Sequence, residues 1–121
     1  MYQQKGKTAF NGKLDNILLF AANLGHPQKK FKSIHVAGTN GKGSVCAAAE
    51  ALLRLAGFKT FLYTSPHLIR YNERFRLDGE DVADDPLVAA IEQVLAADEA
   101  AMAADEKRRR ATFFEVSTAA A

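Results

Sequence analysis

A glycine-rich run between an apolar segment and a segment of helical composition constrains this chain more than any other feature. We expect a buried strand over residues 33–37 and a helix over residues 45–56, with the glycine-rich turn between them. Glycines let backbone N–H groups converge, and a helix N-terminus adds partial positive charge. Lys42 supplies a full charge for the terminal phosphates of a nucleotide. The sequence therefore predicts an ATP-binding loop, made of Gly38, Thr39, Asn40, Gly41, Lys42, Gly43 and Ser44.

The loop departs from the general phosphate-loop pattern at two positions. Val36 stands where the pattern has its first glycine, and Gly43 stands where Ser or Thr follows the lysine. Ser44, one residue later, is the substitute for the missing hydroxyl. The alternative is a glycine-rich turn that only links strand to helix, but the strand before it and the helix after it favour a phosphate loop.

Three further segments indicate which protein family the chain is similar to. They are Tyr63-Thr-Ser-Pro-His-Leu68, Asn72-Glu-Arg74 and Thr112-Phe-Phe-Glu115. Together with the loop, they make the chain resemble folylpolyglutamate synthase and dihydrofolate synthase, enzymes of the Mur ligase superfamily. The resemblance covers essentially residues 14–121. It implies a three-layer α/β domain with a mainly parallel sheet and a phosphate-binding loop, here cut short. Residues 1–121 would form the N-terminal part of the ATP-binding domain, without the rest of that domain and without the C-terminal domain.

The resemblance also implies an activity. The enzymes of this family add L-glutamate to dihydropteroate or to the polyglutamate tail of a reduced folate, through an acyl phosphate. ATP and Mg²⁺ would be the cofactors, Lys42 would be catalytic, the full-length enzyme would be a monomer, and residues 1–121 alone would be inactive. Two alternatives stay open, namely another Mur-type amino-acid ligase and a nucleotide-binding fragment without catalysis of its own.

Ser65 and Glu115 are the candidate metal ligands. Pro66 pushes Ser65 into an extended conformation, just past the end of an expected strand, where ligands of open α/β sheets bind. From the residues alone, a serine that binds Mg²⁺ or phosphate and a turn-stabilising serine are equally supported. Glu115 lies in an apolar stretch, and by itself that pattern favours a solvent-facing side chain over a hard-cation ligand. The family resemblance implies that both residues bind Mg²⁺.

Arginines alternate with aromatic residues after this loop. Arginines pair with carboxylates and aromatic rings stack on flat rings, so Arg74 and Phe75 suit a folate. An exposed hairpin with a charged face explains the spacing equally well. The resemblance places His67 in the loop that shapes the folate site, although a lone histidine is more often structural. His67, Arg74 and Phe75 are therefore candidate substrate-binding residues.

Apolar spacing predicts the remaining elements. We expect a helix over residues 11–24 and a second strand over residues 59–64, which would run parallel to the first strand with a right-handed crossover. Asp85 and Pro86 start another helix. The faces expected to be buried are Val45, Ala49, Leu52, Leu53 and Ala56 on the helix after the loop, and Leu87, Ile91, Val94, Leu95 and Met102 on the last one.

Two shorter segments have local signals. Asp78-Gly79 predicts a tight turn between short strands. The basic run over residues 107–110 is expected to be a solvated loop rather than a binding patch.

Composition excludes several classes of protein. The chain has 121 residues and a formal net charge of +2, which by itself predicts neither a nucleic-acid nor a membrane partner. Its single cysteine, Cys46, rules out an internal disulfide and fits a reducing compartment. The N-terminus is polar and carries lysines, so we expect no signal peptide. These features predict a cytoplasmic protein.

Overall fold

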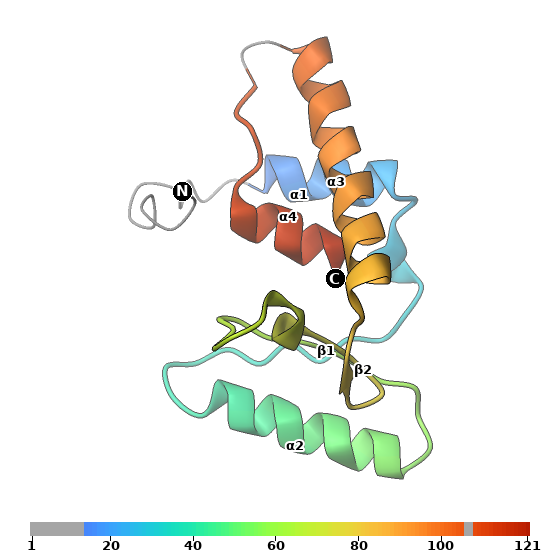
Figure 1. The fold of residues 1–121 in the computed structure, drawn as a ribbon, viewed down its shortest axis with the longest axis vertical. Helices are drawn as coiled ribbons and strands as arrows, with labels where there is room; N and C mark the ends of the chain where they lie inside the picture. Colours follow the sequence, from blue (N-terminus) through green and yellow to red (C-terminus); the bar gives the residue numbers. More distant parts are fainter. Residues whose placement is uncertain (1–13, 106–107) are drawn as a thin grey trace. The chain divides into compact units, whose positions relative to one another are not determined.

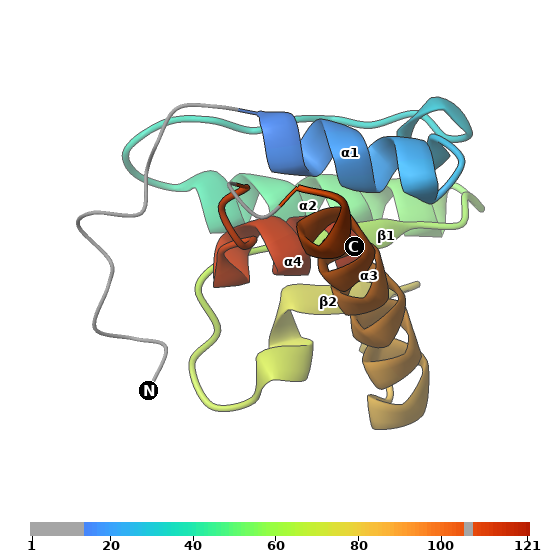
Figure 2. The ribbon, with the colours of Figure 1, turned by 90° about the horizontal axis from the view of Figure 1, so that it is seen from above.

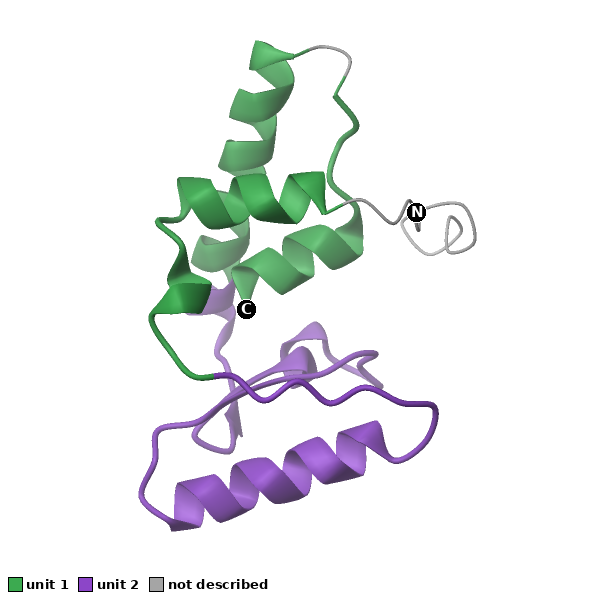
Figure 3. Cartoon of the chain, turned by 180° about the vertical axis from the view of Figure 1, so that it is seen from behind, with its two compact units in different colours: residues 1–32, 88–121 green, residues 33–87 purple. Residues whose placement is uncertain are grey.

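The computed structural model describes residues 14–105 and 108–121 (Figure 1). Its elements, in chain order, are α1 (Asp15–Asn23), η2 (Pro27–Lys29), α2 (Lys42–Leu55), β1 (Phe61–Tyr63), η3 (Tyr71–Arg74), β2 (Phe75–Leu77), β3 (Glu80–Asp81), α3 (Asp84–Ala104) and α4 (Phe113–Ala120). They fall into two compact units, residues 33–87 and residues 1–32 with 88–121, which we describe separately (Figure 3). The start of the helix expected over 11–24, and Lys107 of the basic run, lie outside the described residues.

Residues 33–87 contain a three-stranded antiparallel sheet in the order β1–β2–β3. The turn predicted at Asp78-Gly79 is confirmed, because it joins β2 to β3 and both residues have positive φ angles, 49° and 89°. Positive φ at both central positions gives a two-residue turn whose twist matches the strands it connects. Glycine adopts such an angle without steric cost, which explains its place in the turn.

The strand expected over residues 33–37 is not formed, and the prediction of a parallel strand–helix–strand unit is wrong for the described residues. A strand needs a ladder of hydrogen bonds to a neighbour. No strand in the described part of the chain pairs with residues 33–37. The strand expected over 59–64 is confirmed at its centre as β1, but β1 pairs with β2 in the antiparallel sense.

Helix α2 packs against β1 and begins at Lys42, three residues earlier than expected. The prediction of its buried face is wrong, because Val45, Leu52 and Leu53 are 55%, 68% and 37% exposed. Strands of two or three residues are too short to cover the apolar face of a helix of 14 residues. Glu50 is the one buried residue of α2, at 9% exposure.

The other unit is helical. Its core holds Phe20 of α1 and Val94 of α3, which are 0% and 1% exposed. Helix α1 packs against α4, and the two helices are seen from above in Figure 2. Among the described helices, none is both long and apolar enough to cross a membrane.

Helix α3 begins at Asp84, one residue before the expected start. Of the apolar stripe predicted for it, Leu87 and Val94 are buried, but Leu95 is 44% exposed. The predicted stripe is therefore only partly correct, because the adjacent residues Val94 and Leu95 point in different directions on the helix and differ in burial.

Candidate functional site

The glycine-rich loop leads directly into the first turn of α2, and every residue from Gly38 to Ser44 is exposed. Gly38 and Gly41 have φ angles of 145° and 75°, which favour glycine. The first N–H groups of a helix have no intrahelical partner, so those of Lys42, Gly43 and Ser44 are available as donors. The helix dipole adds partial positive charge at the same end. The loop therefore suits an anion such as phosphate.

The side chain of Lys42 folds back over this loop. Its Nζ donates to the carbonyl oxygen of Thr39 at 3.1 Å and also to that of Gly38. These bonds hold a positive charge beside the backbone donors. A phosphate oxygen is a stronger partner for an ammonium group than a neutral carbonyl, because both partners are then charged. A phosphate bound at the loop could therefore replace these carbonyl oxygens as the hydrogen-bond partner of Lys42 Nζ.

Glu50 attaches α2 to the sheet. Its Oε1 accepts hydrogen bonds from Thr60 Oγ1 at 2.7 Å and from Arg54 Nε at 3.2 Å. Glu50 and Thr60 are only 9% and 8% exposed, so water competes little with their bond. Sequence reasoning missed this attachment, although an acid four residues before an arginine on one helix is a recognisable pairing signal.

Glu73 stiffens the loop that precedes it. Its carboxylate accepts the backbone N–H groups of Leu68, Ile69 and Arg70 at 2.7, 3.0 and 2.8 Å. The hydrogen bond from the Arg70 backbone, followed by that from Leu68, lowers the pKa of Glu73 from its usual value of 4.5. The order of this loop therefore depends on the charged form of Glu73.

The structure brings the three candidate substrate residues together. His67 Nδ1 accepts a hydrogen bond from Arg74 Nε at 2.8 Å. Tyr71 lies edge-on to His67, with ring centroids 5.8 Å apart, and its ring lies 5.7 Å from the Arg74 guanidinium carbon. Arg74 and Phe75 are buried, at 7% and 1% exposure, whereas His67 is half-buried. Of the three, His67 alone presents a partly open side chain, and Phe75 packs in the core of its unit.

The carboxylate of Glu115 is surrounded by donors. Arg109 Nη2 and Nη1 donate to Oε1 and Oε2 at 2.8 and 3.2 Å. Oε2 also accepts from the backbone N–H of Thr112 at 2.7 Å, from its Oγ1 at 2.9 Å, and from Asn16 Nδ2 at 3.3 Å. Burial raises the pKa of Glu115, but the bonds from Arg109 and Thr112 outweigh it and lower the pKa to about 2. The sequence pattern alone favours a solvent-facing side chain, but the side chain of Glu115 is only 15% exposed.

The basic run also differs from its expectation. Arg109 pairs with Glu115, and Arg108 Nη2 donates to Asn16 Oδ1. The prediction of a solvated loop agrees with the exposure of Arg109 and differs at Arg108, which is half-buried; both arginines bond to other residues of the helical unit. Arg110 is exposed.

The two candidate metal ligands belong to different units. Ser65 is exposed in the loop after β1, and Glu115 lies in α4. Within residues 14–105 and 108–121, no group of three or more His, Cys, Asp or Glu side chains is arranged to hold a metal ion. Mg²⁺ in nucleotide sites takes one or two carboxylates together with phosphates and water, so a serine hydroxyl and one carboxylate suit it chemically.

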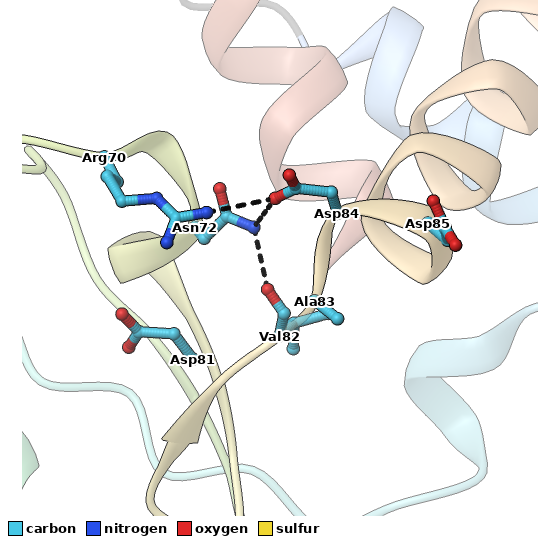
Figure 4. Close-up of a pocket in the computed structure, with 7 residues that line it drawn as sticks. All are labelled: Arg70, Asn72, Asp81, Val82, Ala83, Asp84 and Asp85. Carbon is cyan, nitrogen blue, oxygen red and sulfur yellow. Dashed lines mark hydrogen bonds and ion pairs between the residues drawn. The ribbon is translucent and has the colours of Figure 1, made fainter.

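A pocket of about 400 Å³ lies in residues 33–87 where the chain enters α3 (Figure 4). Asn72 Nδ2 donates to the carbonyl oxygen of Val82 and to Asp84 Oδ1, both at 2.8 Å, and Arg70 Nη2 pairs with Asp84 at 3.2 Å. These bonds tie η3 to the first residue of α3. The polar lining is therefore explained by contacts within the chain.

No family model matches the chain. The dihydrofolate synthase/folylpolyglutamate synthase of Bacillus subtilis is 40% identical to it over 100 residues, which are 83% of this chain and 23% of that protein. Folylpolyglutamate synthetase from Lactobacillus casei superposes with a TM-score of 0.83 at 40% identity, over 90% of this chain and 28% of that one. A complex of folylpolyglutamate synthetase (FPGS) with AMPPCP and folate superposes with a TM-score of 0.85 at 40% identity, over 91% of this chain and 27% of that one.

The chain spans about a quarter or less of the length of the relatives it matches. At 40% identity and these TM-scores, the likeness extends to sequence and fold together. The expectation of a truncated α/β domain of the Mur ligase type is confirmed by these neighbours. Over the stretch that it shares with them, the chain therefore belongs to the folylpolyglutamate synthase and dihydrofolate synthase family.

Proposed function

We propose that the chain is the nucleotide-binding part of an ATP-dependent ligase that adds L-glutamate to a pteroate or folate carboxylate. The observation that carries the proposal is the loop from Gly38 to Ser44, with its open backbone donors at the N-terminus of α2 and Lys42 held above them. A related solved structure is a complex with AMPPCP and folate, and this supports ATP and a folate as ligands here.

The proposed reaction has two steps. A carboxylate oxygen of the pteroate or folate attacks the γ-phosphorus of ATP, so that ADP leaves and an acyl phosphate forms. The amine of L-glutamate then attacks the acyl carbon, and phosphate leaves as the amide bond forms. Lys42 and the loop N–H groups bind the phosphates and stabilise the charge that moves from the γ-phosphate to ADP.

Ser65 and Glu115 are the residues that would hold Mg²⁺, on the strength of their oxygen donors and of the family resemblance. A magnesium ion held by these two residues would neutralise charge during phosphoryl transfer. Glu115 fits this role because its low pKa keeps it charged at neutral pH. In the part of the chain that the structure describes, its Oε1 also accepts a bond from Arg109 alone. Ser65 fits because its hydroxyl is exposed beside the end of β1.

His67 and Arg74 are the proposed substrate contacts, with His67 touching the ligand and Arg74 orienting His67 through the bond to Nδ1. Dihydropteroate and reduced folates are both proposed substrates, since the relatives carry both names. A monomeric, cytoplasmic enzyme without a nucleic-acid or membrane partner remains our prediction for the whole protein.

The test uses a longer protein in which the chain continues as it does in its relatives. With ATP, Mg²⁺ and L-glutamate, we expect phosphate release only when dihydropteroate or a reduced folate is added. Release with cell-wall nucleotide precursors instead would favour another Mur-type ligase.

Lys42→Ala should remove most of the phosphate release and leave the circular dichroism spectrum unchanged, because the bonds of this side chain to the described residues all lie within its own loop. Lys59→Ala, at an exposed lysine outside the loop, is the matched control. Unchanged turnover in Lys42→Ala with a normal spectrum would refute the phosphate-loop assignment.

A further inference from the structure

Arg109 pairs with Glu115, the carboxylate that the proposed function assigns to Mg²⁺. Its guanidinium binds Glu115 through two nitrogens, with Nη2 at 2.8 Å from Oε1 and Nη1 at 3.2 Å from Oε2. A two-point pair of this kind satisfies both charge and geometry. Glu115 therefore already has a cationic partner from its own chain.

The two oxygens of Glu115 differ in how they are held. Oε2 is bound into the first turn of α4 by Thr112, whose backbone and hydroxyl donate at 2.7 and 2.9 Å, and by Asn16 at 3.3 Å. Among residues 14–105 and 108–121, Oε1 accepts from Arg109 alone. If Arg109 moves away, Oε2 stays in place and Oε1 becomes free. A free carboxylate oxygen held by a fixed helix cap is a suitable monodentate ligand for a hard cation.

Arg109 is also the more exposed partner of the pair. Its side chain is 42% exposed, whereas that of Glu115 is 15% exposed. Asp98 and Asp15 attract the guanidinium as well, so a released Arg109 keeps favourable neighbours in the same unit. Solvent can hydrate the exposed guanidinium as it leaves, which lowers the cost of this exchange.

We propose that Arg109 is a stand-in for the metal ion, pairing with Glu115 Oε1 when no divalent cation is bound and leaving it when one binds. The proposal rests on the proposed role of Glu115. A guanidinium and a divalent cation repel each other and cannot occupy the same side of one carboxylate oxygen. Arg109 therefore occupies Oε1 when no cation is bound, and it lowers the affinity of this carboxylate for cations.

The experiment measures cation binding directly rather than activity. Mn²⁺ prefers the same oxygen ligands as Mg²⁺ and broadens nearby NMR signals. Broadening of the Thr112 and Glu115 amide signals, titrated with Mn²⁺ on the full chain, gives an affinity for this carboxylate. Because Arg109 competes with the cation for Oε1, we expect Arg109→Gln to bind Mn²⁺ about three- to tenfold more tightly than the parent.

Arg110→Gln is the matched control, since it makes the same charge change one residue away on a side chain that is exposed. We expect its affinity for Mn²⁺ to stay within about twofold of the parent, because a charge outside the pair is screened by solvent. A second readout is the thermal midpoint. Arg109→Gln should lower it in EDTA, and the difference from the parent should narrow in excess Mg²⁺.

Three results would overturn the proposal. If Arg109→Gln and Arg110→Gln raise the affinity equally, the effect is net charge. If Glu115→Gln abolishes the broadening but Arg109→Gln binds Mn²⁺ as the parent does, Glu115 keeps its metal role and the stand-in role of Arg109 is wrong. If millimolar Mn²⁺ broadens neither signal in any variant, both the metal role of Glu115 and the stand-in role are wrong.

Discussion

Replacing Thr60 with valine tests how firmly α2 is attached to the sheet. The change keeps the branched shape that suits an extended chain and removes only the hydroxyl that donates to Glu50 at 2.7 Å. A hydrogen bond to a charged group contributes roughly 1.5–3 kcal/mol. Glu50 keeps its bond from Arg54, whose side chain is 43% exposed, so part of the loss is compensated. We therefore expect Thr60→Val to lower the free energy of unfolding by about 1.5 kcal/mol.

Urea denaturation followed by circular dichroism measures this change, and a double-mutant cycle isolates the bond. Glu50→Met removes the carboxylate but keeps a straight side chain that favours helix. The double variant should lose about 1 kcal/mol less than the sum of the two single losses, because neither partner is then buried without the other. Thr64→Val, the same change beyond the other end of β1, is the control.

A loss below about 0.5 kcal/mol for Thr60→Val, with strictly additive losses in the cycle, would refute the reasoning. It would mean that the bond between Thr60 and Glu50 does not hold α2 against β1.

Two further predictions concern the loops. The pKa of Glu73 is lowered, so its carboxylate is charged and accepts its bonds from Leu68 and Ile69 above pH 4.5. These bonds are lost as pH falls through the lowered pKa. The amides of Leu68 and Ile69 should therefore lose hydrogen-exchange protection in acid only. Equal protection across that range would contradict this reading. In the glycine-rich loop, Gly43→Ala should stabilise α2 by about 0.5–1 kcal/mol yet weaken nucleotide binding, because the new Cβ projects from a phosphate-binding turn. Gly41→Ala, at a φ of 75°, should instead destabilise by about 1 kcal/mol, and thermal denaturation with and without ATP separates the two.

Local signals in the sequence were enough for the parts of the fold that depend on neighbouring residues. The turn at Asp78-Gly79, the centre of β1 and the existence of α2 are all set by nearby residues, and each is confirmed. The strand expected over 33–37 failed because a strand also needs a partner, which the local pattern does not specify. The buried face of α2 failed for the same reason, since its exposure depends on the width of the sheet beside it.

One part of the candidate site could have been predicted but was not. Thr112 and Glu115 stand three residues apart before an apolar run, which is the sequence signature of a capping box. The structure has this reciprocal pair at the start of α4, with Glu115 N donating to Thr112 Oγ1 at 3.2 Å. The role of Arg109 was beyond prediction, because nothing local distinguishes it from its neighbours in the basic run.

The hydrogen bond of Glu50 fixes α2 at a point that is distant from the glycine-rich loop at the N-terminus of the helix. Glu50 lies eight residues from Lys42, about 12 Å away along the axis. If the helix tilts by about 5° about Glu50, its N-terminal end at Lys42 moves by about 1 Å. A displacement of this size can slow a catalysed reaction by about 100-fold. If the loop binds phosphate as proposed, its orientation would depend on Glu50 and Thr60, which lie outside the loop.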